Sequence, residues 1–272
     1  MKRHLLISTV AIICMALVSC TISIDGESLG GKTIKGDGNI VTCDFDVSAF
    51  DELSVALPAM VNFTVGDDYT CTVRVDENIM EYLNVEVEDD ALLLKRKDEH
   101  KIVTLRATEF VIDVTAPRLE DINLMGSGTI NVLSPLEGEE IDVNLAGSGD
   151  VVFKEAVTVQ KIDLNVAGSG DLVCTQLVAD KLDATVAGSG DLKVSGGTVR
   201  KADADVAGSG DIVLLCDIEE LDADVAGSGD IKARVSVRLE YSIFGSGDIG
   251  YYGNPAVEGD KVGSGGVTRL GD

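Results

Sequence analysis

The chain has 272 residues, and its 47 acidic against 22 basic side chains give a formal net charge of −25 at pH 7. So acidic a surface repels the phosphates of nucleic acid and offers no polybasic attachment to anionic lipid, which argues against both classes of partner. The length is sufficient to bury a sizeable hydrophobic core in one domain.

Residues 1–19 have the features of a lipoprotein signal peptide. A positive pair, Lys2 and Arg3, precedes the apolar run 5–18, which is shorter than the roughly 20 residues that a membrane-spanning helix needs. The run ends in Leu17-Val18-Ser19-Cys20, which looks like a bacterial lipobox. We therefore predict lipid attachment at Cys20. An ordinary signal peptide with an incidental cysteine is the alternative.

This lipid would make the membrane a partner of the chain. Residues 20–38 are rich in Gly, Lys, Asp and Ser, and we interpret them as a tether from the lipid to the folded part. The predicted location is the cell envelope, with the lipid in the outer membrane. Whether the chain faces the periplasm or the outside stays open, because residues 21–24 form no clear sorting signal.

Residues 39–117 contain strand-like runs without a repeated turn. Apolar and polar residues alternate at 53–55, 61–65, 71–75, 85–87 and 111–115, which is typical of strands with one buried face. The segment 78–83 is expected to form one helical turn. We favour irregular early coils continuous with the repeats that follow, over a small separate head packed on their end.

A repeat dominates residues 118–272. Gly-Ser-Gly begins at eight positions, with spacings of 18 to 21 residues: Gly126, Gly147, Gly168, Gly188, Gly208, Gly227, Gly245 and Gly263. An aspartate follows in six of the eight copies: Asp150, Asp171, Asp191, Asp211, Asp230 and Asp248. Apolar residues lie two apart on both sides of each copy, as in half-buried strands. The atypical first and last copies are expected of end units in a stacked array.

We predict an all-β fold, a right-handed parallel β-helix with one coil for each repeat. An antiparallel meander is the weaker alternative, because it needs a second tight turn in every unit and the other connections are dissimilar. Glycine reaches positive φ without a Cβ penalty, and the aspartate can accept backbone N–H groups as in an Asx-turn. The predicted structural ladder includes Gly147, Ser148, Gly149, Asp150, Gly168, Ser169, Gly170, Asp171, Gly188, Gly208, Gly227 and Gly245.

Four cysteines remain after Cys14 leaves with the signal and Cys20 takes the lipid: Cys43, Cys71, Cys174 and Cys216. Their spacing matches no metal-ligand pattern. We expect buried free thiols, with a Cys43–Cys71 disulfide as the alternative. In a β-helix Cys174 and Cys216 lie two coils apart, about 10 Å, which is beyond the reach of a disulfide.

The aspartates are the main candidates for chemistry. We interpret the ladder from Asp150 to Asp248 as a solvated row of turn residues, with Ca²⁺ along it as the sharper hypothesis. A second acidic column, at Asp163, Asp183, Asp203 and Asp222, lies on the strand before the turn. The motif differs from the Gly-Gly-x-Gly-x-Asp calcium repeat, so we predict neither a metal site nor a cofactor.

Catalytic equipment is sparse. His100 is the only histidine beyond the signal, it lies in a charged run, and the chain has no Trp. No Ser/His/Asp or Cys/His arrangement can therefore be assembled. We predict no enzymatic activity and no catalytic residues, while a polysaccharide-active lyase or hydrolase on the same scaffold is the alternative.

Several motifs together resemble a known family. They are the segments 36–40 (Gly-Asp-Gly-Asn-Ile), 50–55 (Phe-Asp-Glu-Leu-Ser-Val), 76–78 (Asp-Glu-Asn) and 251–255 (Tyr-Tyr-Gly-Asn-Pro), with the Gly-Ser-Gly-Asp units between. With these motifs, about residues 36–270 resemble the head GIN domain proteins of Bacteroidetes, described as putative auto-transporter adhesins. The resemblance implies a pectin-lyase-like β-helix and an adhesive role, and it carries over no catalytic residue.

The function predicted from the sequence is therefore a lipid-anchored envelope protein that acts as an adhesin, binding a protein or glycan surface, or as a purely structural protein. The contacts are expected on a flat β-face or on residues 39–117. The oligomeric state stays open.

Overall fold

The computed structural model describes residues 32–97 and 103–272. The N-terminal part comprises β1 (Lys32–Lys35), β2 (Ile40–Phe45), β3 (Glu52–Val55), β4 (Met60–Val65), β5 (Thr70–Asp76), α2 (Glu77–Met80), β6 (Leu83–Glu88), β7 (Ala91–Arg96), β8 (Val103–Arg106) and β9 (Phe110–Ala116). The repeats comprise β10 (Asp121–Gly126), β11 (Thr129–Val132), β12 (Leu136–Glu137), β13 (Glu140–Gly147), β14 (Asp150–Gly168), β15 (Leu172–Gly188), β16 (Leu192–Val194), β17 (Gly197–Gly208), β18 (Ile212–Gly227), β19 (Ile231–Gly245), β20 (Ile249–Tyr252), β21 (Ala256–Gly263) and β22 (Val267–Gly271).

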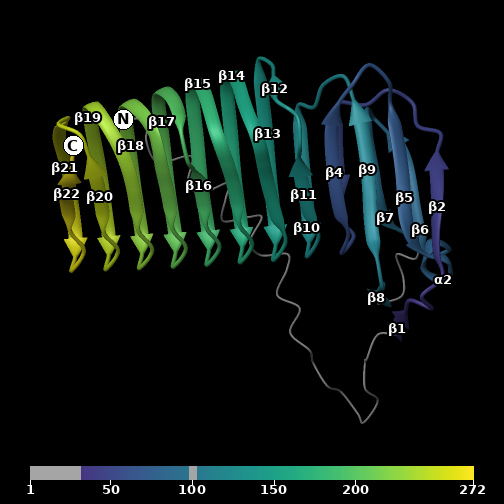
Figure 1. Cartoon of the computed structure of the whole chain (residues 1–272). Helices are drawn as coiled ribbons and strands as arrows, with labels where there is room; N and C mark the ends of the chain where they lie inside the picture. Colours follow the sequence, from purple (N-terminus) through teal and green to yellow (C-terminus); the bar gives the residue numbers. More distant parts are fainter. Residues whose placement is uncertain (1–31, 98–102) are drawn as a thin grey trace, which may run out of the picture.

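The repeats stack as a parallel β-solenoid, which confirms the predicted β-helix (Figure 1). Equivalent positions of successive coils pair in parallel, so the first glycine of every Gly-Ser-Gly lies beside that of the next coil, from Gly126 to Gly263. Buried residues alternate with outward ones along three straight segments of a coil, for example 151–153, 157–159 and 162–166. Between these segments the alternation breaks, which marks two corners besides the glycine corner.

The geometry of the corner explains why glycine occupies this position in all eight copies. Gly168 has φ +137°, and a Cβ added to it would lie 2.1 Å from the carbonyl oxygen of Gly147. The N–H of Ser169 donates to that same oxygen at 2.8 Å, and the N–H of Ser189 repeats the bond to Gly168. Successive corners are therefore in direct backbone contact, and a side chain at this position would separate the coils.

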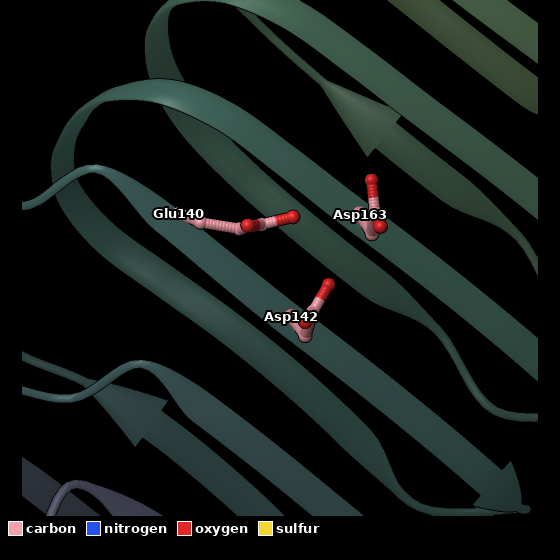
Figure 2. A group of neighbouring side chains, drawn as sticks. All are labelled: Glu140, Asp142 and Asp163. Atoms are coloured by element: carbon pink, nitrogen blue, oxygen red, sulfur yellow. The ribbon is translucent and has the colours of Figure 1, made fainter.

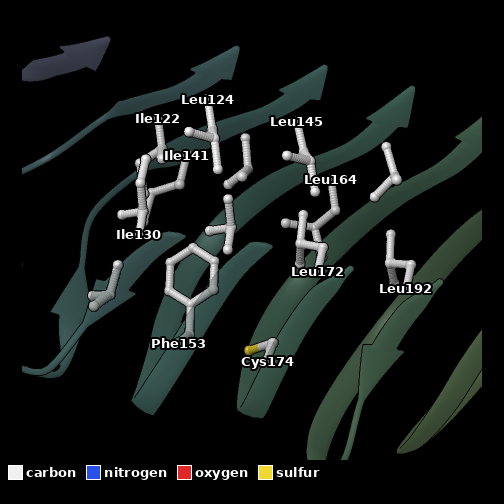
Figure 3. Close-up of a cluster of buried hydrophobic side chains, with 14 of the residues drawn as sticks. Ile122, Leu124, Ile130, Ile141, Leu145, Phe153, Leu164, Leu172, Cys174 and Leu192 are labelled. Carbon is white, nitrogen blue, oxygen red and sulfur yellow. The ribbon is translucent and has the colours of Figure 1, made fainter. Parts of the chain in front are cut away.

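The interior of the solenoid is filled with apolar side chains (Figure 3). Phe153 and Phe63 are the largest fully buried side chains, and the cluster is continuous from the N-terminal strands to Ile249. Because each coil repeats the same inward positions, the core is a column of apolar layers. Among the described residues, no helix is long and apolar enough to cross a membrane.

The N-terminal strands begin as coils and end as an antiparallel cap. β3 pairs in parallel with β10, and β4 pairs in parallel with β11. On their other edges, β3 pairs in parallel with β7 and β4 with β9, so both rows of strands continue into the N-terminal part. Beyond them the direction changes, because β5 pairs antiparallel with β9, β2 with β5 and β6 with β7. The helical turn occupies Glu77–Met80, slightly before the expected segment 78–83. The antiparallel strands cover one end of the core.

Candidate functional site

The corner aspartates form an exposed row along one edge of the stack. The Oδ1 atom of Asp150 accepts the backbone N–H of Asp171 at 3.2 Å, and this bond recurs in each later coil up to Gly266. The expected Asx-turn, a bond within one corner, is thus replaced by a bond between coils. The row consequently fastens each coil to the next, and half of every carboxylate is already used by the fold.

The second acidic column lies as predicted, one carboxylate above the next. Asp142, Asp163, Asp183, Asp203 and Asp222 are consecutive partners in the parallel register. Lysines of the neighbouring column reduce the repulsion: the Nζ of Lys181 lies 2.6 Å from Asp183 and 3.6 Å from Asp203. A second lysine, Lys201, also faces Asp203 at 3.7 Å, so positive and negative side chains alternate across these coils; we call this arrangement the mixed-charge column.

One group of three carboxylates among the described residues could reach a common cation: Glu140, Asp142 and Asp163 (Figure 2). The Nζ of Lys161 lies 2.5 Å from Glu140 and 2.8 Å from Asp163, so an ammonium already offsets part of the charge of the group. Burial raises the pKa of Asp163 against the opposing effect of Lys161, and its Oδ1 is buried without a hydrogen-bond partner. Because the lysine stands where Ca²⁺ would be needed, the group is better suited to an internal ion pair.

The lysine column ends at Lys201, where Glu220 takes the equivalent position. Asp205 and Asp224 pair next to Asp203 and Asp222, and their other register partners in the adjoining coils are Thr185 and Ser242. Asp205 is exposed to solvent, but desolvation by neighbouring groups and the charges of Asp224, Asp203 and Asp222 raise its pKa to about 6. Four aspartates thus lie next to one another in this part of the face, which we call the repulsive section.

A groove crosses the coils at another corner. Its volume is about 570 Å³, and its residues come from β14, β15, β17, β18 and β19. The apolar floor includes Val159 and Ala179, each only 7% exposed. The polar lining residues are Gln160, Asp180, Thr198, Arg200, Asp217, Glu219 and Ser236. The long axis follows the stacking direction, because the lining positions of successive coils are register partners.

Sequence reasoning placed contacts on a β-face or on residues 39–117 but missed this groove. The lining residues differ from coil to coil, so no repeated motif reveals them. The only signal is the break in alternation near residues 160–161, where the apolar positions shift from odd to even numbers. Such a break indicates a corner, and a corner of a stacked coil can be hollow.

Two of the quoted motifs meet at the N-terminal cap. The backbone N–H of Gly38 donates to Asp76 Oδ1 at 2.8 Å, and that of Asp37 donates to Asn78 Oδ1 at 3.1 Å. Asp76 is the only buried charged side chain among the described residues, with 0% exposure. Its burial alone would raise its pKa, but the N–H groups of Thr108 and Gly38 outweigh that effect and lower it. We call residues 36–39 and 76–78 the polar knot.

The four cysteines in the described residues are free thiols, so the alternative Cys43–Cys71 disulfide is not formed. Cys71, Cys174 and Cys216 are buried as expected, and burial raises the pKa of each to about 12. The expectation of a buried thiol is wrong for Cys43, which is exposed. Its strand lies at the edge of the cap, where the core no longer covers it.

Some predictions concern residues outside the described part. Cys20, the signal peptide 1–19, most of the tether 20–38 and His100 fall in residues 1–31 and 98–102. Their predicted roles stay predictions.

The sequence matches the family described as "Putative auto-transporter adhesin, head GIN domain" over residues 49–212 and 147–255. The chain belongs to the head GIN domain family. The predicted resemblance is thereby confirmed. No curated protein matches the sequence.

Solved structures of similar chains agree with this membership. A putative lipid binding protein from Parabacteroides distasonis is 32% identical, with a TM-score of 0.85 over 88% of this chain and 100% of that one. A putative adhesin from the same species is 31% identical, with a TM-score of 0.79 over 88% and 100%. Another from Parabacteroides merdae is 27% identical, with a TM-score of 0.81 over 88% and 99%. These three chains share the solenoid of this protein; one is described as a putative lipid binding protein and two as putative adhesins.

Proposed function

We propose that this head GIN protein is a lipid-anchored envelope adhesin that binds a neutral glycan chain along the groove at the 159–161 corner. The groove carries the proposal, because it combines an apolar floor with hydrogen-bonding side chains from successive coils. A linear polymer laid along the stack would meet equivalent positions at each coil, about 4.8 Å apart. The adhesin-type family supports a cell-surface or envelope location.

The chemistry of the lining residues favours a polar and uncharged ligand. Asp180, Asp217 and Glu219 can accept hydrogen bonds from sugar hydroxyls, and Arg200 can donate to hydroxyl or ring oxygens. A net charge of −25 repels an acidic polysaccharide over long range. The floor at Val159 and Ala179 can contact the apolar face of a sugar, although it offers no aromatic platform.

Catalysis is the competing reading of the same groove, since carboxylates also serve sugar-cleaving enzymes. No histidine lines the described groove, and its carboxylates are accompanied by Arg200 within an open surface. Binding without turnover is therefore the simpler use of these residues, and it agrees with the descriptions of the relatives.

The anchor is the second part of the proposal. Cys20 precedes β1, and β1 lies at the capped end of the solenoid (Figure 1). A lipid at Cys20 would hold that end near the membrane and leave the repeats to extend away from it. Metabolic labelling with a fatty acid tests this: the wild type should incorporate label and Cys20→Ser should not. Protease shaving of intact cells would then tell the outer face from the periplasmic one.

Glycan binding is tested with an array of neutral and acidic polysaccharides, followed by titration calorimetry of the best binder. We expect saturable binding without product release, and Arg200→Ala should weaken it at least tenfold. Lys193→Ala, which removes an exposed cation from another face, should leave it unchanged. Release of shorter sugars would favour the enzyme instead, whereas silence on the array would favour a purely structural role.

A further inference from the structure

The outermost strand of the cap has an open edge. Among the described residues, β2 pairs with β5 alone, and it lies at the far end of the stack from the C-terminal coils (Figure 1). Val41 and Phe45 are only half-buried, and Cys43 between them is exposed. We propose that β2 pairs antiparallel with β2 of a second copy of this chain, with the two-fold axis passing between the two Cys43 residues.

The first argument is the direction of the backbone groups. In an antiparallel pair, hydrogen-bonded and non-hydrogen-bonded residue pairs alternate along the strands. The N–H of Glu77 donates to the carbonyl of Asn39 at 2.8 Å, so Asn39 is a hydrogen-bonded position. The register then makes Val41, Cys43 and Phe45 the next positions whose N–H and C=O groups bond to β5. Thr42 and Asp44 therefore direct their N–H and C=O groups to the open edge. A second β2 strand would satisfy them.

The second argument is the register. A two-fold axis perpendicular to a sheet always places one residue opposite itself. With Cys43 at the axis, Thr42 of each copy lies opposite Asp44 of the other, so their backbones exchange hydrogen bonds and the hydroxyl can donate to the carboxylate. On the other face, Val41 lies opposite Phe45, and this pair covers apolar surface that is half-exposed in one chain.

Neighbouring registers are worse. An axis at Asp44 would place two carboxylates directly opposite each other, which is destabilising. An axis at Thr42 would set Asp44 against Ile40 and leave Phe45 beyond the paired segment, opposite Asn39. Of these three registers, only the axis at Cys43 sets Val41 opposite Phe45 and Thr42 opposite Asp44; it places Ile40, at the start of the strand, opposite Asp46 just beyond its end.

The small area of the contact predicts a weak dimer. Two strands of six residues bury far less than the roughly 1,200 Å² of stable interfaces. The charge of −25 on each copy adds repulsion. The dimer is accordingly weak in solution and forms where copies are concentrated. It is distinct from the glycan groove, which lies on coils far from β2.

The opposed thiols provide a direct assay. Cys43 would form a non-hydrogen-bonded pair, in which Cα atoms are about 4.5 Å apart and within disulfide reach. Oxidised glutathione supplies the oxidant: a Cys43 thiolate displaces one glutathione, the second Cys43 thiolate attacks the mixed disulfide, and two reduced glutathiones leave. The full chain in detergent should yield a covalent dimer on non-reducing electrophoresis, and Cys43→Ser should yield none.

Two variants separate the proposed register from random collision. The double variant Cys43→Ser/Thr42→Cys moves the thiol by one residue to the other face, where the two sulfur-bearing residues lie beyond about 7 Å. It should cross-link at least tenfold more slowly than the wild type. Thr42→Pro removes an edge donor without breaking a bond to β5, and it should also slow cross-linking at least tenfold while the melting temperature is kept. Equal cross-linking rates for the wild type and the double variant would overturn the proposal.

Discussion

The N-terminal part (residues 32–97 and 103–116) and the repeats (residues 121–271) both stack strands in parallel, yet different contacts hold them together. In the repeats, each coil contacts the next through glycine corners and a row of aspartates, so the same few bonds recur. In the cap, strands reverse direction and segments far apart in the sequence meet at the polar knot around Asp76. A repeated array can therefore be weakened at any corner, whereas the cap depends on single residues.

The two ends of the solenoid close accordingly. The cap covers one end with antiparallel strands, while the last coils close the other with side chains. Tyr241 and Tyr251 pack against the end of the core. Beyond them, Lys261 and Arg269 occupy inward positions of the last coil. The Nζ of Lys261 donates to the carbonyl of Gly265, and the Nε of Arg269 donates to the carbonyl of Gly253. Inward charges of this kind discourage a further strand from adding to the edge.

The largest effect is expected at a corner in the middle of the repeats. Gly168→Ala should destabilise the fold by about 3 kcal/mol, because positive φ and a clash with the Gly147 carbonyl act together. Gly126→Ala is the matched control, since a Cβ there meets nothing within 4 Å, and it should cost about 1 kcal/mol. Thermal unfolding followed by circular dichroism measures both, and equal losses would contradict the role of corner contacts.

The next effect tests the cap. Asp76→Asn should lower the melting temperature by about 5 °C at pH 7, since the amide cannot accept both N–H groups as well as the carboxylate does. Asp37→Asn, at an exposed position of the same knot, should change it little. Because folding lowers the pKa of Asp76, its contribution is present above pH 4 and is lost as the pH falls through the native pKa. Wild type and variant should therefore converge in acid.

These two tests mark what the sequence could and could not predict. The period of Gly-Ser-Gly fixes the perimeter of a coil, so the stacking, the acidic columns and most buried positions follow from spacing alone. The antiparallel cap does not follow, because alternation at 71–75 identifies a strand but not its partner or direction. The groove could not be predicted for a related reason. Its lining residues share a corner of the coil, but they share no residue type that would form a repeated motif.

A smaller effect is expected where the mixed-charge column meets the possible cation site. Lys161→Met should cost about 1 kcal/mol, since both of its ion pairs are partly exposed. It also leaves Glu140, Asp142 and Asp163 without their ammonium. Millimolar Ca²⁺ should then raise the melting temperature of the variant, while the wild type should respond little. If Ca²⁺ raised the melting temperature of the wild type as much as that of the variant, the native protein would bind calcium and this prediction would be wrong.

The smallest effect belongs to the repulsive section of the acidic face. Asp205→Asn should stabilise the protein at pH 7 by about 0.5 kcal/mol, because solvent screens much of the repulsion at this exposed residue. The pKa of Asp205 is raised to about 6, so the contribution of its protonated form is complete below pH 4 and is lost as the pH rises through 6. The stability difference between variant and wild type should therefore open between pH 4 and 6. Asp191→Ala, in the corner row, should instead destabilise, since it removes the oxygen that accepts the N–H of Asp211. If both substitutions changed stability in the same direction, the two acidic rows would not differ in the way their hydrogen bonds indicate.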